Sequence, residues 1–162
     1  MQIAQLNVAT ALYDLDDERM AGFVGRLDEI NALADRSRGF VWRLQSDAGN
    51  ATAIRADDDP RLIVNMTVWT RIEALFDFAY RSDHRLVMAE RRAWFAKPDG
   101  PYQVLWWVPA GHRPSLDEGL ERLAHLRAHG ATPHAFTFKQ AFPPNRAEPV
   151  DLKPEPYCVG GA

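Results

Sequence analysis

The sequence predicts an α+β protein with a ferredoxin-like antiparallel sheet whose helices cover one face. Segments in which apolar and polar residues alternate are separated by segments with helical spacing, in the order β-α-β-β-α(α)-β-α-β. The first six elements match the βαββαβ arrangement. The chain has 162 residues, 46% of them hydrophobic, which is enough to bury one core.

The N-terminal part is expected to hold two strands and one helix. Residues 2–10 alternate between apolar and polar side chains, which is typical of a half-buried strand. Acidic residues precede an apolar stripe with helical spacing, so a helix is expected over 17–36, and Gly39 ends the connection. A second strand follows at 40–46, and residues 47–50 have the composition of a hairpin turn.

The central stretch changes its period in the middle. Residues 62–69 separate their side chains onto two faces, as a strand does, and the apolar spacing over 72–79 is that of a helix. Residues 81–83 interrupt this helix, and a second, Arg-rich helix is expected from His84 to Trp94. Strand, helix, break and helix therefore form the middle of the predicted fold.

The C-terminal part begins with another strand at 102–108, where the period of two returns. Ser115 and Glu118 have the spacing of a capping box, in which each side chain reaches a free backbone N–H. The helix that they begin is expected to stop at Gly130, which suits the position after a helix end. A last strand is expected at 134–142.

Residues 1–142 are therefore expected to form one domain. Residues 143–162 contain many prolines and little apolar pattern, which predicts an extended arm or a disordered tail.

Composition excludes several classes of protein. A net charge of −3 gives no reason to expect nucleic acid. No apolar run approaches the ~20 residues that span a bilayer, and the N-terminus lacks the features of a signal peptide, so we expect no membrane and a cytoplasmic protein. The single Cys158 excludes a disulfide framework within the chain. No phosphate-binding loop, dinucleotide-binding or nucleophile motif is present.

The two faces of the predicted sheet differ in character. We expect the helices to pack on the apolar face, which collects Leu6, Val8, Phe40, Trp42, Val64, Met66, Val68, Val104 and Trp106. The opposite face, here called the polar-aromatic face, collects Gln5, Asn7, Arg43, Asn65, Thr67, Trp69, Gln103 and Trp107.

The polar-aromatic face is too polar for a core and too aromatic for a plain wet surface. Two exposed indoles would make a patch that monomers tend to avoid. Pairing the sheet with its copy would enclose a polar-aromatic cavity, so we predict a homodimer that binds a small-molecule ligand between its sheets. The alternative is an ordinary solvated sheet with two partly covered Trp residues.

Several segments resemble a bacterial family known only as a domain of unknown function, which is grouped with the dimeric α/β-barrel superfamily. They are AQLNVA, NALADRSRGFVWRLQ, RLIVNMTVWTRIEAL, YRSDHR, RRAWF and VLWWVPAGHRP, and the resemblance spans residues 3 to about 143. It implies that residues 1–142 are a dimeric α/β-barrel domain.

More distantly, the T-V-W strand end followed by a helix is similar to the antibiotic-biosynthesis monooxygenases and the haem-degrading enzymes of that superfamily. This resemblance implies oxidation of a small aromatic or macrocyclic substrate with O₂. In the haem-degrading branch the site has an Asn on the first strand, a helical Trp and a helical His. Asn7 matches the Asn, whereas Phe78 lies nearest the Trp position and His84 lies closer to the strand than that ligand.

The leading functional hypothesis is a monooxygenase-like enzyme that acts on an aromatic or quinol-type substrate without a tightly held cofactor. His84 would move a proton, and the amides of Asn7 and Asn65 would hold substrate oxygens or a developing oxyanion. Trp69 and Trp107 would stack on the substrate. The other residues expected to bind substrate are Arg43, for an anionic group, and Thr67 and Gln103.

Two further groups of side chains are interpreted without a catalytic role. His125 and His129 have the i, i+4 spacing of a two-His metal site, but Leu126 stands where a zincin has Glu, and we predict no metal site. Arg85, Arg91 and Arg92 either bind a ligand's carboxylate or phosphate or pair with carboxylates across a dimer contact, and we favour the second.

Two alternative functions stay open. A haem-binding protein would use His84 as the axial ligand of the iron. A non-catalytic dimer would bind a small ligand without turning it over.

Overall fold

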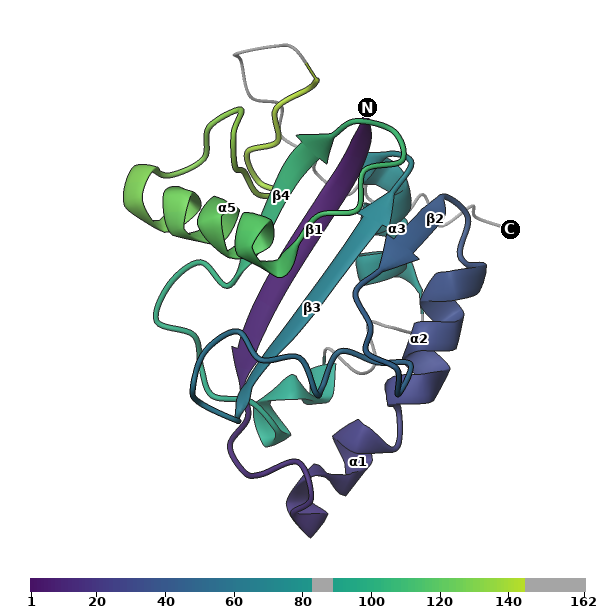
Figure 1. Cartoon of the computed structure of the whole chain (residues 1–162), viewed down its shortest axis with the longest axis vertical. Coiled ribbons are helices and arrows are strands. Elements are labelled where there is room, and N and C mark those ends of the chain that lie inside the picture. Colours follow the sequence, from purple (N-terminus) through teal and green to yellow (C-terminus); the bar gives the residue numbers. More distant parts are fainter. Residues whose placement is uncertain (83–88, 145–162) are drawn as a thin grey trace, which may run out of the picture.

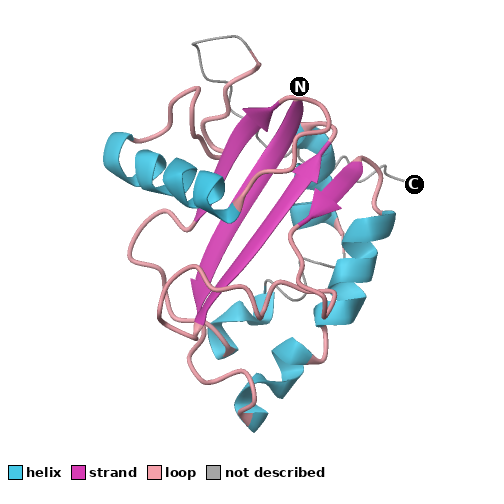
Figure 2. Ribbon diagram, in the orientation of Figure 1, coloured by secondary structure: helices cyan, strands magenta, loops and turns pink. Residues whose placement is uncertain are grey.

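The computed structural model of the protein describes residues 1–82 and 89–144 (Figure 1). The strands are β1 (Gln2–Thr10), β2 (Phe40–Arg43), β3 (Leu62–Trp69) and β4 (Gln103–Val108). The helical segments are η1 (Glu18–Met20), α1 (Ala21–Val24), α2 (Leu27–Arg36), α3 (Ile72–Arg81), η2 (Arg91–Ala93) and α5 (Leu116–His129). In Figure 2 the strands form one layer, with helices beside and across it.

The four strands form one antiparallel sheet in the order β2-β3-β1-β4. β1 and β2 are therefore parallel with β3 between them, and β3 and β4 are parallel with β1 between them. Each parallel pair is joined through a helix, α2 in the first case and α3 in the second. This is the ferredoxin-like βαββαβ topology, so the predicted α+β class is confirmed.

The two crossover helices lie on one face of the sheet, as expected when both crossovers are right-handed. That face is the polar-aromatic one. α3 packs Ile72 and Leu75 into a cluster with Ile3, Trp69 and Leu105, which point to this side of the sheet. The prediction that these helices pack on the apolar face is wrong, because the apolar end of the polar-aromatic face offers α3 a large buried surface.

The apolar face is covered by α5, which crosses in front of β4 and β1 while α3 lies behind the sheet (Figure 1). Leu123 and Leu126 of α5 join the cluster formed by this face. A Cβ added to Gly119 would lie 3.1 Å from the Met66 sulfur and 3.3 Å from Leu6, so the helix backbone comes very close to the strands.

The face-to-face dimer predicted from the sequence is wrong in its geometry, because α2 and α3 occupy the polar-aromatic face that it would use.

Two local irregularities were not expected. A bulge between Phe40 and Trp42 turns Phe40 to the Trp69 side of the sheet and leaves Val41 exposed. The helix expected over 17–36 is divided into η1, α1 and α2, and α2 begins only after Gly25. Glycine weakens helices, and at Gly22 the missing side chain also lets the Trp94 indole approach the backbone.

The end of the described chain is less regular than predicted. The strand expected at 134–142 is reduced to isolated bridges, in which Phe136 exchanges both backbone hydrogen bonds with Leu105 of β4 at 2.9 Å. The helix expected from His84 to Trp94 has η2 as its last part, and residues 83–88 lie outside the described residues. Most of the Pro-rich segment, residues 145–162, also lies outside them.

The capping box at the start of α5 is only half formed. The Ser115 hydroxyl accepts a hydrogen bond from the Glu118 backbone N–H at 3.1 Å, as predicted. The Glu118 carboxylate turns instead to the indole N–H of Trp106, 2.8 Å away, and to the imidazole of His112, 2.7 Å away. These bonds tie the 109–115 turn to β4. Within residues 1–82 and 89–144, no helix has the length and apolar character needed to cross a membrane.

Candidate functional site

A cavity of about 200 Å³ lies within the single chain, between the polar half of the polar-aromatic face and the helices that cover it. The sheet contributes Gln5, Asn7, Asn65, Thr67 and Gln103 to its wall, and α2 and α3 contribute Leu27, Ile30, Asn31, Ala34, Leu75 and Phe78. Residues near η2 and the start of β4 complete it, among them Arg91, Trp94 and Tyr102. A second copy of the chain is not needed to form this wall.

Three amide side chains form one row across the sheet. Asn7 in β1 pairs with Asn65 in β3 on one side and with Gln103 in β4 on the other. Residues directly opposite each other in antiparallel strands have Cβ atoms about 5 Å apart. The row therefore places three hydrogen-bonding groups side by side on the cavity wall.

A second row of polar side chains lies two residues along the strands, where Gln5 in β1 pairs with Thr67 in β3. Its hydrogen bonds orient the Asn7 amide of the first row. The Trp69 indole N–H donates to Thr67 Oγ1 at 2.9 Å, and the Thr67 hydroxyl donates to Gln5 Oε1 at 3.0 Å. Gln5 Nε2 then donates to Asn7 Oδ1 at 2.7 Å. We call these four residues the donor chain.

The donor chain has a fixed direction. An indole nitrogen can only donate, so the Thr67 oxygen accepts from Trp69 and its hydroxyl hydrogen is left for Gln5. The Gln5 oxygen is thereby used as acceptor, and its NH₂ group points to the Asn7 oxygen. Among the described residues, the Asn7 NH₂ group at the end of the chain donates no hydrogen bond, and the Asn7 oxygen has already accepted one from Gln5. The site therefore offers the contents of the cavity a donor at Asn7, which suits an anionic or carbonyl oxygen.

The opposite wall combines aromatic rings with guanidinium groups. The Arg91 guanidinium lies 4.6 Å from the centre of the Tyr102 ring, and the Arg26 guanidinium lies 5.6 Å from that of Trp94. Arg26 also pairs with Glu90 at 3.0 Å, so Arg91 is the less engaged of the two cations. Tyr80 reaches the same cavity from α3. Partial burial, and then the neighbouring Tyr102 phenol, raise the pKa of Tyr80 above its usual value, which keeps this hydroxyl protonated.

The structure brings five of the predicted site residues together at the cavity: Asn7, Asn65, Thr67, Gln103 and Arg43. Arg43 is also held by protein groups. Its guanidinium donates to both oxygens of Asp35, at 2.9 and 3.3 Å, and to the carbonyl oxygen of Gly49 at 2.6 Å. The partner that a half-buried guanidinium requires is thus supplied by the chain itself.

The two Trp residues expected to stack on a substrate do not reach the cavity. Trp69 is fully buried, with ring centres 5.3 Å from Phe40 and 5.0 Å from Phe78, and its role is to start the donor chain. Trp107 lies in the same cross-strand row as Trp69, at the end of the sheet away from the amide row, and its indole N–H donates to the Phe142 carbonyl at 2.6 Å. Neither is among the described residues that line the cavity. His84 lies outside the described residues.

The sequence interpretation missed most of the opposite wall. One signal was available: Asn31 is the polar member of the stripe that α2 turns to the cavity with Leu27, Ile30 and Ala34. Tyr80 and Tyr102 gave no comparable signal, because their approach depends on how α3 and the start of β4 meet in space.

Several solved structures are similar to this chain at low sequence identity. SnoaB, a cofactor-independent oxygenase from Streptomyces nogalater, is 18% identical, with 67% of this chain and 93% of that chain covered and a TM-score of 0.48. A putative antibiotic biosynthesis monooxygenase from Nitrosomonas europaea is 17% identical over 60% of this chain and 82% of that chain, with a TM-score of 0.43. Another from Chloroflexus aurantiacus J-10-fl is 16% identical over 70% and 98%, also with a TM-score of 0.43.

No curated protein matches the chain significantly. A family model described as a domain of unknown function, DUF3291, matches residues 2–152, which is nearly all of the sequence. The resemblance found in the sequence segments is thereby confirmed. The chain belongs to the DUF3291 family.

Proposed function

We propose that this protein is a small-molecule, monooxygenase-like enzyme that oxidises a phenolic or quinol-type aromatic substrate with O₂ in the cavity above Asn7 and Asn65. The observation that carries the proposal is the direction of the donor chain, which ends in a donor at Asn7 in a partly open, partly aromatic cavity. The sequence resemblance to the antibiotic-biosynthesis monooxygenases points to the same class of reaction.

The size of the cavity limits the substrate. A cavity of about 150 Å³ accommodates benzene, whereas pockets for drug-sized ligands measure roughly 300–1,000 Å³. At about 200 Å³, this cavity fits one aromatic ring with small polar substituents. The same volume argues against a macrocycle as large as haem, so we place the haem alternative second. Its proposed axial ligand, His84, lies outside the described residues.

The amide row and the opposite wall would contact different parts of the substrate. Asn7, assisted by Asn65 and Gln103, would donate to the phenol oxygen and stabilise it as a phenolate. Arg91 and the ring of Tyr102 would lie against the substrate from the other side and favour the same anion. An electron-rich phenolate is the form of the ring that reacts with O₂.

The proposed reaction needs no added reductant. When a phenol is converted into a para-quinone, one atom of O₂ enters the ring as the new carbonyl oxygen and the other leaves as water. The substrate itself supplies all four electrons. The phenolic proton must leave before this step, and His84, predicted from the sequence to move a proton, remains the proposed acceptor.

The test is O₂ uptake by the purified protein with single-ring phenols and quinols, and with larger fused-ring analogues for comparison. The proposal expects uptake that matches quinone formation one to one and that favours the single-ring compounds. Asn7→Ala should reduce turnover about 10²-fold or more, by loss of the terminal donor. Gln45→Ala, at an exposed amide that is not part of the cavity wall, is the matched control. Saturable binding without O₂ uptake would reject the enzyme and favour the non-catalytic ligand-binding alternative.

We still propose that the protein is a homodimer, as predicted from the sequence. Its two chains would meet through a surface other than their polar-aromatic faces. Light scattering on the purified protein tests it directly.

A further inference from the structure

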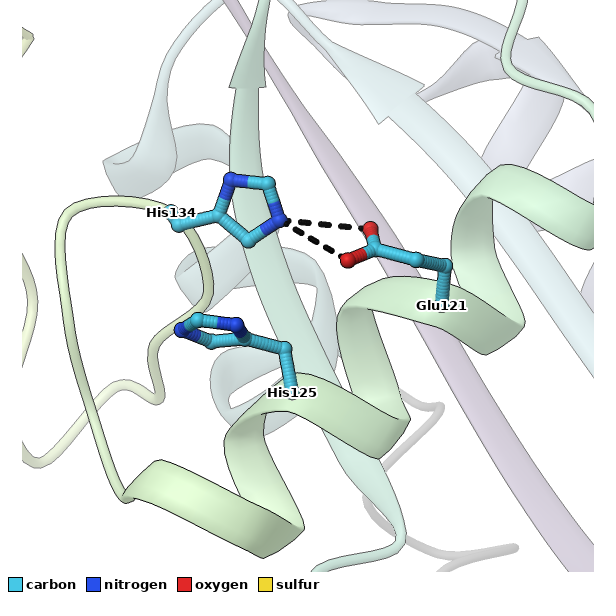
Figure 3. Close-up of side chains that lie close together, drawn as sticks. All are labelled: Glu121, His125 and His134. Carbon is cyan, nitrogen blue, oxygen red and sulfur yellow. Dashed lines mark hydrogen bonds and ion pairs between the residues drawn. The ribbon is translucent and has the colours of Figure 1, made fainter.

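The outer side of α5 carries a cluster of metal-ligating side chains that is separate from the cavity. Glu121, His125 and His129 are spaced by four residues and therefore share one side of the helix. The turn that follows α5 folds back and brings His134 over His125, as Figure 3 shows together with Glu121. The sequence pattern revealed only the His125 and His129 pair, because the approach of His134 depends on this turn.

The distances in the cluster are close to those of a metal site. One ligand atom from each of Glu121, His125 and His134 lies within 4.8 Å of the others. His134 Nε2 is 3.1 and 3.2 Å from the two Glu121 oxygens. Ligands at 2.0–2.1 Å from a tetrahedral Zn²⁺ are about 3.3 Å apart, so rotation of the side chains suffices to close the site.

The backbone holds His134 in place without a metal. Thr132 and Ala135 exchange backbone hydrogen bonds of 2.9 and 3.1 Å, which forms a tight turn. Gly130 has a φ of 74°, which lets the chain reverse directly after α5. His125 Nε2 lies 3.1 Å from the Thr132 hydroxyl, so the turn is attached to the helix at the cluster itself. A site built in this way loses little entropy when an ion binds.

The contacts of His134 distinguish its two ring nitrogens. The Arg122 guanidinium only donates, so the ring nitrogen that accepts from it must have a free lone pair. Nε2 also faces the Glu121 carboxylate, which only accepts, and this leaves Nδ1 as the acceptor. The ring centres of His129 and His134 are each 4.6 Å from that of His125. Neutral imidazoles are the form that binds metal ions.

Arg122 is the cation that a metal ion would have to displace. Its Nε is buried without a hydrogen-bond partner among the described residues and lies 3.6 Å from a Glu121 oxygen. The guanidinium thus supplies positive charge to the cluster with incomplete hydrogen bonding. An ion that took over Glu121 and His134 would leave Arg122 free to turn toward solvent.

We propose that Glu121, His125 and His134 bind a divalent transition metal ion of the Zn²⁺ class, with His129 or water as the fourth ligand. Two imidazoles and one carboxylate are a donor set that Zn²⁺ accepts. The ion joins the 130–135 turn to α5, on the side of the sheet away from the cavity. The site is independent of the proposed oxidation.

The experiment is calorimetric titration of the full-length protein, without an affinity tag, with Zn²⁺. One ion per chain is expected, together with a higher melting temperature. His125→Ala and His134→Ala should each weaken binding at least tenfold, since loss of a direct ligand costs no less than loss of an outer-shell partner. His112→Ala removes an imidazole outside the cluster and should leave the affinity unchanged.

Two further measurements keep the result decisive. Arg122→Ala should bind Zn²⁺ as tightly as the unchanged protein or more tightly, because the competing cation is removed. Co²⁺ in place of Zn²⁺ should give the visible absorption of a four-coordinate ion, which His134→Ala loses. Unsaturable binding, or equal affinity in His134→Ala and His112→Ala with both variants folded by circular dichroism, would overturn the proposal.

Discussion

The Thr67 hydroxyl donates a hydrogen bond to Gln5 Oε1 across the two central strands, at 3.0 Å and in a fully enclosed part of the sheet. Gln5 and Thr67 are the two buried polar residues among the described part of the chain. Their bond connects a buried indole at one end to a cavity-facing amide at the other. This hydrogen bond therefore links the buried core to the proposed site.

Thr67→Val is expected to destabilise the protein and to disorder the site together. Valine has nearly the same shape but leaves the Trp69 indole N–H and the Gln5 oxygen without partners, at a cost of about 1–3 kcal/mol for each stranded group. Urea unfolding measures the loss, and Thr10→Val, at the end of β1, is the control. Equal stability of the two variants would contradict the role given to the donor chain.

Asn65→Ala should separate activity from stability. The Asn65 amide makes no hydrogen bond with the described residues, so its removal should change the free energy of unfolding by less than about 0.5 kcal/mol. Turnover should nevertheless fall by about 10²-fold, because an oxyanion donor is lost. Steady-state O₂ uptake and thermal melting of the same preparation give both quantities. A large fall in stability would show that the amide has a structural role instead.

Arg43 is expected to stabilise the 44–60 segment rather than to bind the substrate. Arg43→Lys keeps the charge but cannot form the two-pronged contact with Asp35 while also reaching Gly49. Because Asp35 is about half exposed, we expect a loss of about 1 kcal/mol, with faster proteolysis within residues 44–60. A raised KM at unchanged stability would instead identify Arg43 as the group that binds a substrate anion.

Tyr80 should ionise at a pH above that of a free tyrosine, 10.0. A pKa that is raised in the folded state stabilises the fold at pH values below 10, and this contribution is lost as the pH rises through the folded-state pKa. Ultraviolet absorbance of the phenolate follows the titration. Tyr102→Phe removes one cause of the shift and should lower the pKa of Tyr80. An unchanged titration in this variant would contradict the proximity of the two phenols.

Sequence periodicity was sufficient to predict the four strands, α3 and α5, because each has a clear period of two or of a helix turn. The side on which each helix packs could not be predicted from it. α3 buries Ile72 and Leu75 against Trp69, so a face that looked polar in its middle is apolar at one end. Amphipathic patterns report that a face is buried and leave open which element covers it.

The sequence predicted the sheet side of the candidate site and missed the opposite wall. Strand register follows from alternation, and it placed Asn7, Asn65 and Gln103 on one face correctly. The indole of Trp69 lies on the same face but is buried in the core outside the cavity. Its burial depends on packing against Phe40 and Phe78, which the sequence does not reveal. Residues from distant segments that line one cavity, such as Tyr80 and Tyr102, leave no local pattern in the sequence.

The most direct test of the account is a crystal structure of the protein with a single-ring quinol bound. The account predicts the ring within the cavity, with a phenolic oxygen at hydrogen-bonding distance from the Asn7 NH₂ group and the Arg91 side of the cavity against the opposite face of the ring. A quinol bound elsewhere, or one whose hydroxyl donates to an Asn7 oxygen freed from Gln5, would contradict it.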